Sequence, residues 1–232
     1  MCCIPRNKAW TLAILLATFL FVLSTEASAQ KQPTQTQLHF FFAFGAQTVV
    51  EGVQKLVPIE TKTALKSGDL IKFFLQSDTE IYFYFFHLSS RENLTLLFPT
   101  NNQPPRLNPG TQVYVPEGAM WLELDAQTGL EKFFLIASSS RLERLEKLYE
   151  RHTSLEDKSA SQSSVAAILS EISKLDKRGK RLSVPAEKPI SLAGRLRDPN
   201  KKDTTIIPDI DSFSIELIAH GIYSKTFTID HR

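Results

Sequence analysis

Short runs of aromatic and β-branched residues alternate with clusters of turn-forming residues between positions 65 and 140. Glycine, proline, asparagine, aspartate and serine gather in these clusters, as in Ser67-Gly68-Asp69 and Asn108-Pro109-Gly110. Short strands at such regular spacing are typical of all-β sandwiches and barrels. The pattern predicts a mainly β fold, either an antiparallel β-sandwich or an open barrel. The predicted strands are 70–75, 81–88, 94–98, 112–115, 120–124 and 132–137.

The run at 81–88 carries aromatic side chains on both faces of the predicted strand. Alternation places Tyr82 and Tyr84 on one face and Phe83 and Phe85 on the other. Aromatic rows can stack sugars or bases, but a strand that is hydrophobic on both faces is typical of a covered central strand. We therefore predict that this strand lies inside the fold.

Further strands are predicted on either side of this region. The aromatic run 38–44 predicts a strand, and apolar residues at helical spacing over 49–57 predict a short helix after it; one long strand bent at Gly45 is the alternative. Residues 213–229 predict a C-terminal hairpin with a three-residue loop that ends at Gly221. One face of that hairpin would carry Phe213, Leu217, Tyr223 and Phe227 into the main core.

Two short amphipathic helices are predicted on the connection that follows the last of the central strands. Apolar residues recur at helical spacing over 141–152 and again over 164–178, with charged residues between them. Both helices are expected to dock on one side of the sheet. Residues 179–211 contain few apolar residues, several prolines and no periodicity, which predicts a long basic loop.

The first 29 residues have the three parts of a secretory signal peptide. A short basic region precedes a 14-residue run from Trp10 to Leu23 that is apolar apart from two threonines, and Ala27-Ser28-Ala29 supplies small residues for cleavage. A helix needs about 20 apolar residues to cross a membrane, so no transmembrane anchor is expected after cleavage. Cys2 and Cys3 would leave with this peptide, which excludes disulfides and thiolate sites from the exported product. We predict a periplasmic or secreted protein.

Positive charge is concentrated between positions 174 and 202, a segment that contains ten basic and three acidic residues. A solvated loop is the simpler interpretation of this charge, and contact with an anionic surface, such as lipid, cell-wall polymer or an acidic protein, is the functional alternative. The segment has no aromatic residue, which argues against a nucleic-acid partner. The basic residues proposed for this contact are Lys174, Lys177, Arg178, Lys180, Arg181, Lys201 and Lys202.

No arrangement of residues in the sequence has the spacing of a known catalytic or metal-binding motif. The five histidines include no H-E-x-x-H pair, and there is no glycine-rich phosphate loop. Glu123 and Asp125 share one face of a strand and could bind a hard cation with Glu117 or Glu131, although a solvent-facing strand edge is the simpler explanation. We predict no catalytic, cofactor-binding or metal-binding residues.

Seven spaced elements occur in an order that resembles the bacterial domain-of-unknown-function family 4384. The resemblance covers residues 63–145, and the C-terminal strands look like the tail of longer members. Where the family often has a glycine before its Leu-Phe-Pro element, this chain has Arg91-Glu92. The elements are Leu65–Ile71, Ile81–Phe85, Leu96–Pro99, Asn101-Asn102, Leu107–Gly110, Tyr114–Pro116 and Gly129–Phe133.

The resemblance implies an exported, β-rich accessory module and supplies no catalytic residues. Members are sometimes joined to kinase or peptidase-like domains. Within the motif, Gly68 would permit a tight turn, Pro99 and Pro116 would end strands, and Glu131 would cap or pair near Gly129. The motif residues expected to be structural are Gly68, Asp69, Tyr82, Tyr84, Phe98, Pro99, Pro116, Gly129 and Glu131.

These observations predict a signal peptide at 1–29, a mobile linker at 30–37 and a single β-rich domain at 38–232. The expected function is that of a non-catalytic accessory or interaction module in the bacterial envelope or extracellular space, with an unknown protein or envelope partner. The alternatives are an envelope hydrolase and a β domain that binds a small ligand or a cation.

The exported protein is predicted to begin at Gln30, because Ala27-Ser28-Ala29 places the cleavage site after Ala29. The intact mass of the protein recovered outside the cytoplasm measures this directly. A product that still contains Trp10 would contradict the prediction.

Overall fold

The computed structural model describes residues 36–100, 103–155, 157–182, 184–189 and 210–232. The predicted signal peptide and most of the predicted basic loop lie outside these residues. In the part of the chain that is described, no helix is long and apolar enough to cross a membrane.

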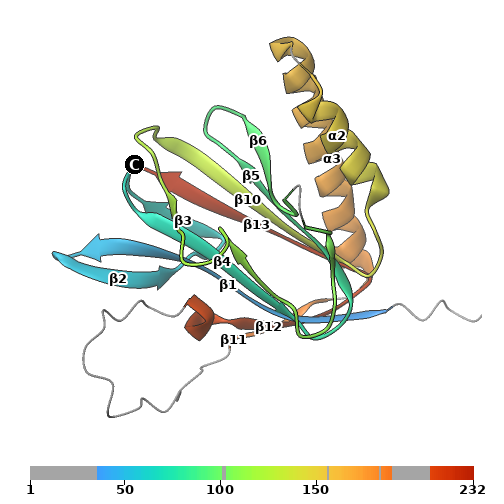
Figure 1. The fold of residues 1–232 in the computed structure, drawn as a ribbon, viewed down its shortest axis with the longest axis horizontal. Coiled ribbons are helices and arrows are strands. Elements are labelled where there is room, and N and C mark those ends of the chain that lie inside the picture. The colour runs from blue at the N-terminus through green and yellow to red at the C-terminus, as the bar shows by residue number, and fades with distance from the viewer. Residues whose placement is uncertain (1–35, 101–102, 156, 183, 190–209) are drawn as a thin grey trace, which may run out of the picture. The chain divides into compact units, whose positions relative to one another are not determined.

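The described strands form two sheets that face each other as a β-sandwich, as the sequence predicts, and they do not close into a barrel (Figure 1). The first sheet contains β1 (Gln37–Val50), β2 (Val53–Pro58), β4 (Leu70–Ser77), β8 (Gln112–Val115), β9 (Leu122–Glu123), β11 (Ala186–Pro189) and β12 (Ile215–His220). The second contains β3 (Lys62–Leu65), β5 (Ile81–Leu88), β6 (Leu94–Phe98), β7 (Arg106–Leu107), β10 (Gly129–Ser138) and β13 (Ile222–His231). Neighbouring strands pair in antiparallel orientation, except for β3 and β13, which are parallel.

Phenylalanine rings fill the space between the two sheets. Phe44 of β1 packs edge-on against Phe85, Phe133 and Phe227 of the second sheet, with ring centroids 5.1 to 5.7 Å apart. Phe73 of β4 stacks on Phe85 at 4.4 Å. Each such ring pair contributes about 0.5–1.5 kcal/mol beyond the burial of its apolar area. These contacts across the sandwich hold the two sheets together.

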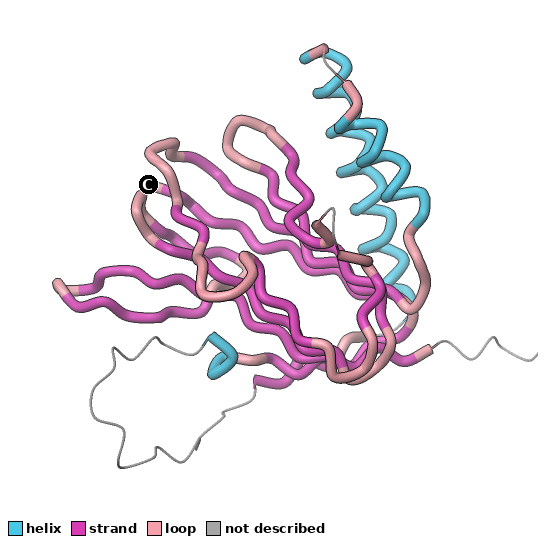
Figure 2. Tube along the Cα trace, viewed as in Figure 1, coloured by secondary structure: helices cyan, strands magenta, loops and turns pink. Residues whose placement is uncertain are grey.

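The second sheet is covered on its other face by two helices, α2 (Glu143–Thr153) and α3 (Lys158–Leu182). Tyr84 and Phe86 of β5 pack there against the apolar stripes of these helices, whereas Phe83 and Phe85 enter the core between the sheets. The prediction that this strand is covered on both faces is therefore confirmed. Figure 2 shows both helices on one side of the sandwich. The buried helical residues are Leu145, Val165, Ile168, Ile172 and Leu175.

The short helix predicted over 49–57 is wrong, and the alternative of one long strand is correct. β1 continues to Val50 and turns back into β2 through the two-residue loop Glu51-Gly52. Both loop residues have positive φ, 54° and 74°, as a two-residue hairpin loop requires. The apolar residues that suggested helical spacing are paired across this hairpin, so the register between strands decides their placement.

The predicted C-terminal hairpin is also wrong, because its two arms belong to different sheets. β12 pairs with β1 and β11, whereas β13 pairs with β10 over ten residues. Gly221, at φ 71°, lies where the chain passes from one sheet to the other. Leu217, Tyr223 and Phe227 still enter the main core as predicted, because both strands present one face to the space between the sheets.

The second helix is longer than predicted, and the basic segment begins inside it. α3 starts at Lys158 rather than 164 and runs through Gly179 to Leu182 rather than ending at 178. A Cβ atom at position 179 would lie 2.7 Å from the carbonyl oxygen of Ile222, so glycine allows α3 to approach β13 closely. After α3, β11 pairs with β12, so parts of the predicted loop 179–211 are helix and strand.

Gly179→Ala is expected to lower stability although alanine is the better helix former. The added methyl group meets a backbone oxygen that no side-chain rotation can move, so α3 must shift from β13. Overpacking of this kind costs about 1–3 kcal/mol, against a gain of about 1 kcal/mol in helix propensity. Thermal unfolding monitored by circular dichroism should show a lower Tm. Ser173→Ala, at an exposed position of the same helix, is the matched control and should not lower the Tm; an equal or higher Tm for Gly179→Ala would contradict the close approach.

Candidate functional site

The turn that contains Gly68 and Asp69 is held by its own hydrogen bonds. Lys66 N donates to Asp69 Oδ2 at 2.8 Å, and Asp69 N donates to Lys66 O at 3.0 Å. Gly68 has φ 85°, a conformation that side chains rarely adopt. The turn is further fixed to Leu124, whose backbone bonds both Gly68 N and Asp69 O. These two motif residues therefore act on the backbone and leave no free functional group.

Glu131 is buried and holds the turn that follows β5. Its carboxylate accepts hydrogen bonds from His87 Nε2 at 2.5 Å and from the backbone N–H of Ser90 at 3.0 Å. A Cβ atom at Gly129 would lie 2.7 Å from Cβ of Ser90, so this glycine allows the turn to pack closely. The ring of His87 stacks on Phe133 at 4.5 Å. Because Glu131 is engaged here, it does not join Glu123 and Asp125.

The remaining motif residues pack or end strands. Phe98 is buried in the core between the sheets, and Tyr82 is packed against the cluster beneath the helices. Pro99 directly follows β6 and Pro116 directly follows β8, each after a cis peptide bond. Tyr84 is the exception, because its hydroxyl reaches α2.

The acidic residues singled out as cation ligands lie on the surface. Glu123 and Asp125 are exposed, and Asp125 Oδ1 accepts a hydrogen bond from the backbone N–H of Gln127 at 2.7 Å. Among the described residues, no three histidine, cysteine, aspartate or glutamate side chains lie close enough together to hold a metal ion.

Three of the other histidines make side-chain contacts. His39 lies between Asp78 and Glu216, with nitrogen–oxygen distances of 3.5 and 2.9 Å. His152 and His231 hydrogen-bond serine hydroxyls of Ser164 and Ser67 at 2.6 and 3.0 Å. Each contact joins segments that are distant in the sequence or on different elements, so these rings stabilise the fold locally.

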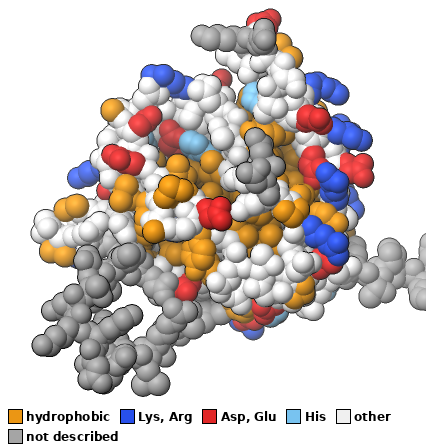
Figure 3. Space-filling model, viewed as in Figure 1, with side chains coloured by type: hydrophobic (Ala, Val, Ile, Leu, Met, Phe, Trp, Pro, Cys, Tyr) orange, Lys and Arg blue, Asp and Glu red, His pale blue; other side chains and the backbone are white. Residues whose placement is uncertain are grey.

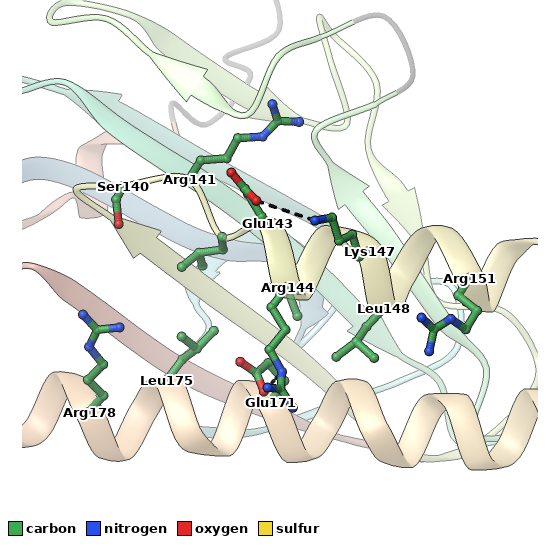
Figure 4. A pocket seen from close by; sticks show the side chains of 12 residues that line it. Ser140, Arg141, Glu143, Arg144, Lys147, Leu148, Arg151, Glu171, Leu175 and Arg178 are labelled. Carbon is green, nitrogen blue, oxygen red and sulfur yellow. Dashed lines mark ion pairs between the residues drawn. The ribbon is translucent and has the colours of Figure 1, made fainter.

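A groove of about 640 Å³ runs between α2 and α3. Figure 4 shows that its side chains come from both helices, with Arg178 at one end and Arg151 at the other. Five basic and two acidic residues line it, so the groove carries an excess of positive charge. We call this the α2–α3 groove. Its charged residues are Arg141, Glu143, Arg144, Lys147, Arg151, Glu171 and Arg178.

Ion pairs neutralise part of the groove and leave two arginines available. Arg144 Nε lies 3.0 Å from Glu171 Oε2 and links the helices, while Lys147 pairs with Glu143 at 3.7 Å. Arg151 and Arg178 form no ion pair with any described residue. A guanidinium presents five donors in a fixed plane that matches carboxylate and phosphate groups. Among the described residues of the groove, Arg151 and Arg178 are therefore the basic groups with the most donors left for an anionic ligand.

The N-terminal end of α2 is anchored by a partly buried network around Glu146. Its carboxylate accepts hydrogen bonds from the Tyr84 hydroxyl at 2.5 Å and from Arg141 Nε at 2.8 Å. Burial raises the pKa of Glu146, but the hydrogen bonds from Arg141 and Tyr84 outweigh it and lower the pKa overall. Burial, together with the hydrogen bond to Glu146, raises the pKa of Tyr84. The network fixes α2, and with it one wall of the groove.

The structure places the predicted basic residues in two groups. Lys174, Lys177, Arg178, Lys180 and Arg181 lie on the last turns of α3, whereas Lys201 and Lys202 lie outside the described residues. Lys180 pairs with Asp176 at 2.7 Å, and Arg178 lines the groove. Figure 3 shows basic side chains along the margin formed by the helices.

Sequence reasoning missed the contribution of α2 to the groove. Arg144, Lys147 and Arg151 fall within the helix predicted over 141–152, where charged residues were expected only as its polar side. Their spacing of three and four residues, which puts them on one face of α2, was the available signal. The spacing cannot show that a second basic helix lies beside this face.

Residues 64–141 match the family model of the domain of unknown function DUF4384, which confirms the resemblance seen in the sequence. No curated protein and no solved structure gives a significant match to the chain. The matched region runs from β3 to the end of β10 and stops at Arg141, just before α2. Both helices that form the groove therefore lie beyond the matched region.

The α2 anchor is expected to make stability depend on pH in the acid range. Because folding lowers the pKa of Glu146, its contribution is complete above the unfolded value of about 4.5 and is lost as the pH falls through the folded value. Glu146→Gln should lower the Tm at pH 7, and the difference from the parent should shrink below pH 4.5. Thermal unfolding from pH 3 to 7 measures this, with Glu143→Gln as the exposed control. A difference that stays constant over this range would contradict the assignment.

Proposed function

We propose that this chain, whose residues 64–141 belong to the family of the domain of unknown function DUF4384, is an exported, non-catalytic interaction module of the bacterial envelope or extracellular space. The α2–α3 groove is its contact site, and an anionic surface is its partner. The observation that carries this proposal is the pair of arginines, Arg151 and Arg178, which lie at the two ends of a basic groove and form no ion pair with a described residue.

The chemistry of the family region supports a binding role. The side chains of its polar motif residues Asp69 and Glu131 accept hydrogen bonds within turns, and the Tyr84 hydroxyl donates a hydrogen bond to Glu146 of α2. A hydrolytic site would need an acid and a base beside one cleft. Glu123 and Asp125 line none of the cavities described for this part of the chain.

The distribution of charge supports an anionic partner. The groove brings Arg141, just before α2, and three basic residues of α2 beside Arg178 near the end of α3, so cations from two parts of the sequence share one surface. Basic residues at the end of α3 also interact favourably with the helix dipole, which gives them a structural reason to be present. The helix dipole does not account for Arg144, which lies in the first turn of α2 and pairs with Glu171 of α3.

The leader-like segment at 1–29 supports an envelope or extracellular location. Its basic, apolar and small-residue regions occur in the order of a secretory signal, and both cysteines of the chain lie within it. An exported protein with a basic surface meets anionic lipid headgroups in the envelope, so a lipid surface is the partner that we commit to.

Neutralising the groove is expected to weaken binding to anionic vesicles. The triple variant Lys147→Gln, Arg151→Gln and Arg178→Gln removes three cations, each worth about 1 kcal/mol near an anionic membrane, so affinity should fall about 100-fold. Sedimentation with phosphatidylglycerol–phosphatidylcholine vesicles measures this, and binding should also fall at high salt because exposed charges are screened.

The matched control changes the same net charge elsewhere. Lys55→Gln, Lys66→Gln and Arg91→Gln are exposed positions away from the helices and should leave vesicle binding within a few-fold of the parent. Equal losses in the two triple variants would show that only overall charge matters. Vesicle binding that survives both the groove variant and high salt would overturn the proposal.

A further inference from the structure

A largely apolar cavity of about 520 Å³ opens beside the aromatic core, and it shares no residue with the α2–α3 groove. Its walls come from β1, β12 and β13, from the turn after β2 and from the short 3₁₀ helix Ile210–Phe213. A cavity of this size, lined by apolar side chains with a few polar groups, is typical of small-molecule sites. The main apolar lining residues are Phe42, Phe44, Ile59, Phe213, Ile215 and Phe227.

The floor of the cavity is part of the aromatic core, and one wall lies nearer to solvent. Phe42, Phe44 and Phe227 are buried in the core between the sheets. Phe213 and Ile215 are partly exposed lining residues. An apolar body that entered the cavity would leave water and gain contacts with these side chains. The apolar part of a ligand would therefore supply most of its binding free energy.

The positive charge in the lining is already neutralised. Lys225 is the only basic residue among the described residues that line the cavity. Its Nζ lies 2.5 Å from Glu187 Oε2, and it also lies 5.5 and 5.8 Å from the ring centroids of Phe42 and Phe227, whose faces attract cations. These contacts hold the ammonium group of Lys225 to the protein, so it offers no uncompensated charge to a ligand.

The carboxylate of Glu60 supplies a negative charge that is not neutralised. Glu60 lines the cavity, and its backbone N–H donates a hydrogen bond to Thr63 Oγ1 at 3.0 Å. Its side chain is exposed and forms no hydrogen bond or ion pair with a described residue. Lys62, the nearest lysine in the sequence, lines a different cavity. The cavity therefore carries one uncompensated negative charge on its solvent side.

We propose that this cavity binds an amphiphilic amine, with the apolar body against Phe44, Phe213 and Ile215 and the ammonium group paired with the carboxylate of Glu60. A carboxylate in the same place would be repelled by Glu60 and would find Lys225 already paired. A neutral head group would keep the apolar contacts and lack the ion pair. The cavity therefore selects its ligand by the charge of the head group.

The test is calorimetric titration of the full exported chain with three probes that share one tail: octylammonium, octanol and octanoate. Octylammonium should bind saturably, with one molecule per chain. It should bind about two- to fivefold more tightly than octanol, the range of an exposed ion pair, and octanoate should bind most weakly. High salt should reduce the difference between octylammonium and octanol, because exposed charges are screened.

A charge-neutral variant of Glu60 separates the head group from the tail. Glu60→Gln should weaken octylammonium binding to the level of octanol and leave octanol binding unchanged, because only the ion pair is lost. Glu123→Gln is the matched control: it removes the same charge at an exposed position that lines none of the described cavities, and should leave the affinity for all three probes unchanged. Both positions are exposed, so both variants should fold.

Nuclear Overhauser effects between the octyl chain and the protein test the location. They should reach the ring protons of Phe44 and Phe213, which line the cavity. Absence of saturable octylammonium binding by the folded protein would overturn the proposal, and so would octanoate binding as tight as that of octylammonium. Equal effects of Glu60→Gln and Glu123→Gln, or Overhauser effects confined to other parts of the chain, would overturn it as well.

Discussion

The packing of phenylalanine rings between the two sheets is the interaction on which the rest of the structure depends. Phe44 touches rings from three strands of the opposite sheet, and Phe73 extends the contact through Phe85. These residues lie far apart in the sequence, so the rings join the N-terminal, central and C-terminal parts of the chain in one core. Removing any one strand from this arrangement would expose aromatic surface on several others.

This core also explains why the helices are needed. β5 and β10 occupy the middle of the second sheet, and their outward-facing residues Tyr84, Phe86 and Ile136 would meet water without α2 and α3. The helices cover that face through their apolar stripes and turn their charged residues outwards, where the α2–α3 groove forms. The groove is thus a consequence of how the second sheet is covered, and Tyr84 connects the two through its bond to Glu146.

Local pattern was sufficient to predict the fold class, the central strand and the two helices, because those features depend on the periodicity of apolar residues. It failed where pairing between distant strands decides the outcome. β12 and β13 are adjacent in sequence, yet each finds its partners in a different sheet. Likewise, residues 49–57 form the end of β1, a turn and most of β2, because the two strands pair with each other. The sequence prediction ended α3 too early, before Gly179. This glycine lies inside the helix because it allows a close approach to the backbone of Ile222, and that approach cannot be read from the neighbouring sequence. The groove combines residues from two helices, and of its basic residues only Arg178, on α3, was singled out from the sequence.

We propose that the two covering helices, rather than the family region, make contact with an anionic surface. The most direct measurement is a map of backbone amide chemical shifts during titration with nanodiscs that contain phosphatidylglycerol. We expect the perturbed amides to cluster on α2 and α3, around Arg144, Arg151 and Arg178, with little change in the first sheet. Perturbations centred on the strands of the family region, or no perturbation at low salt, would contradict it.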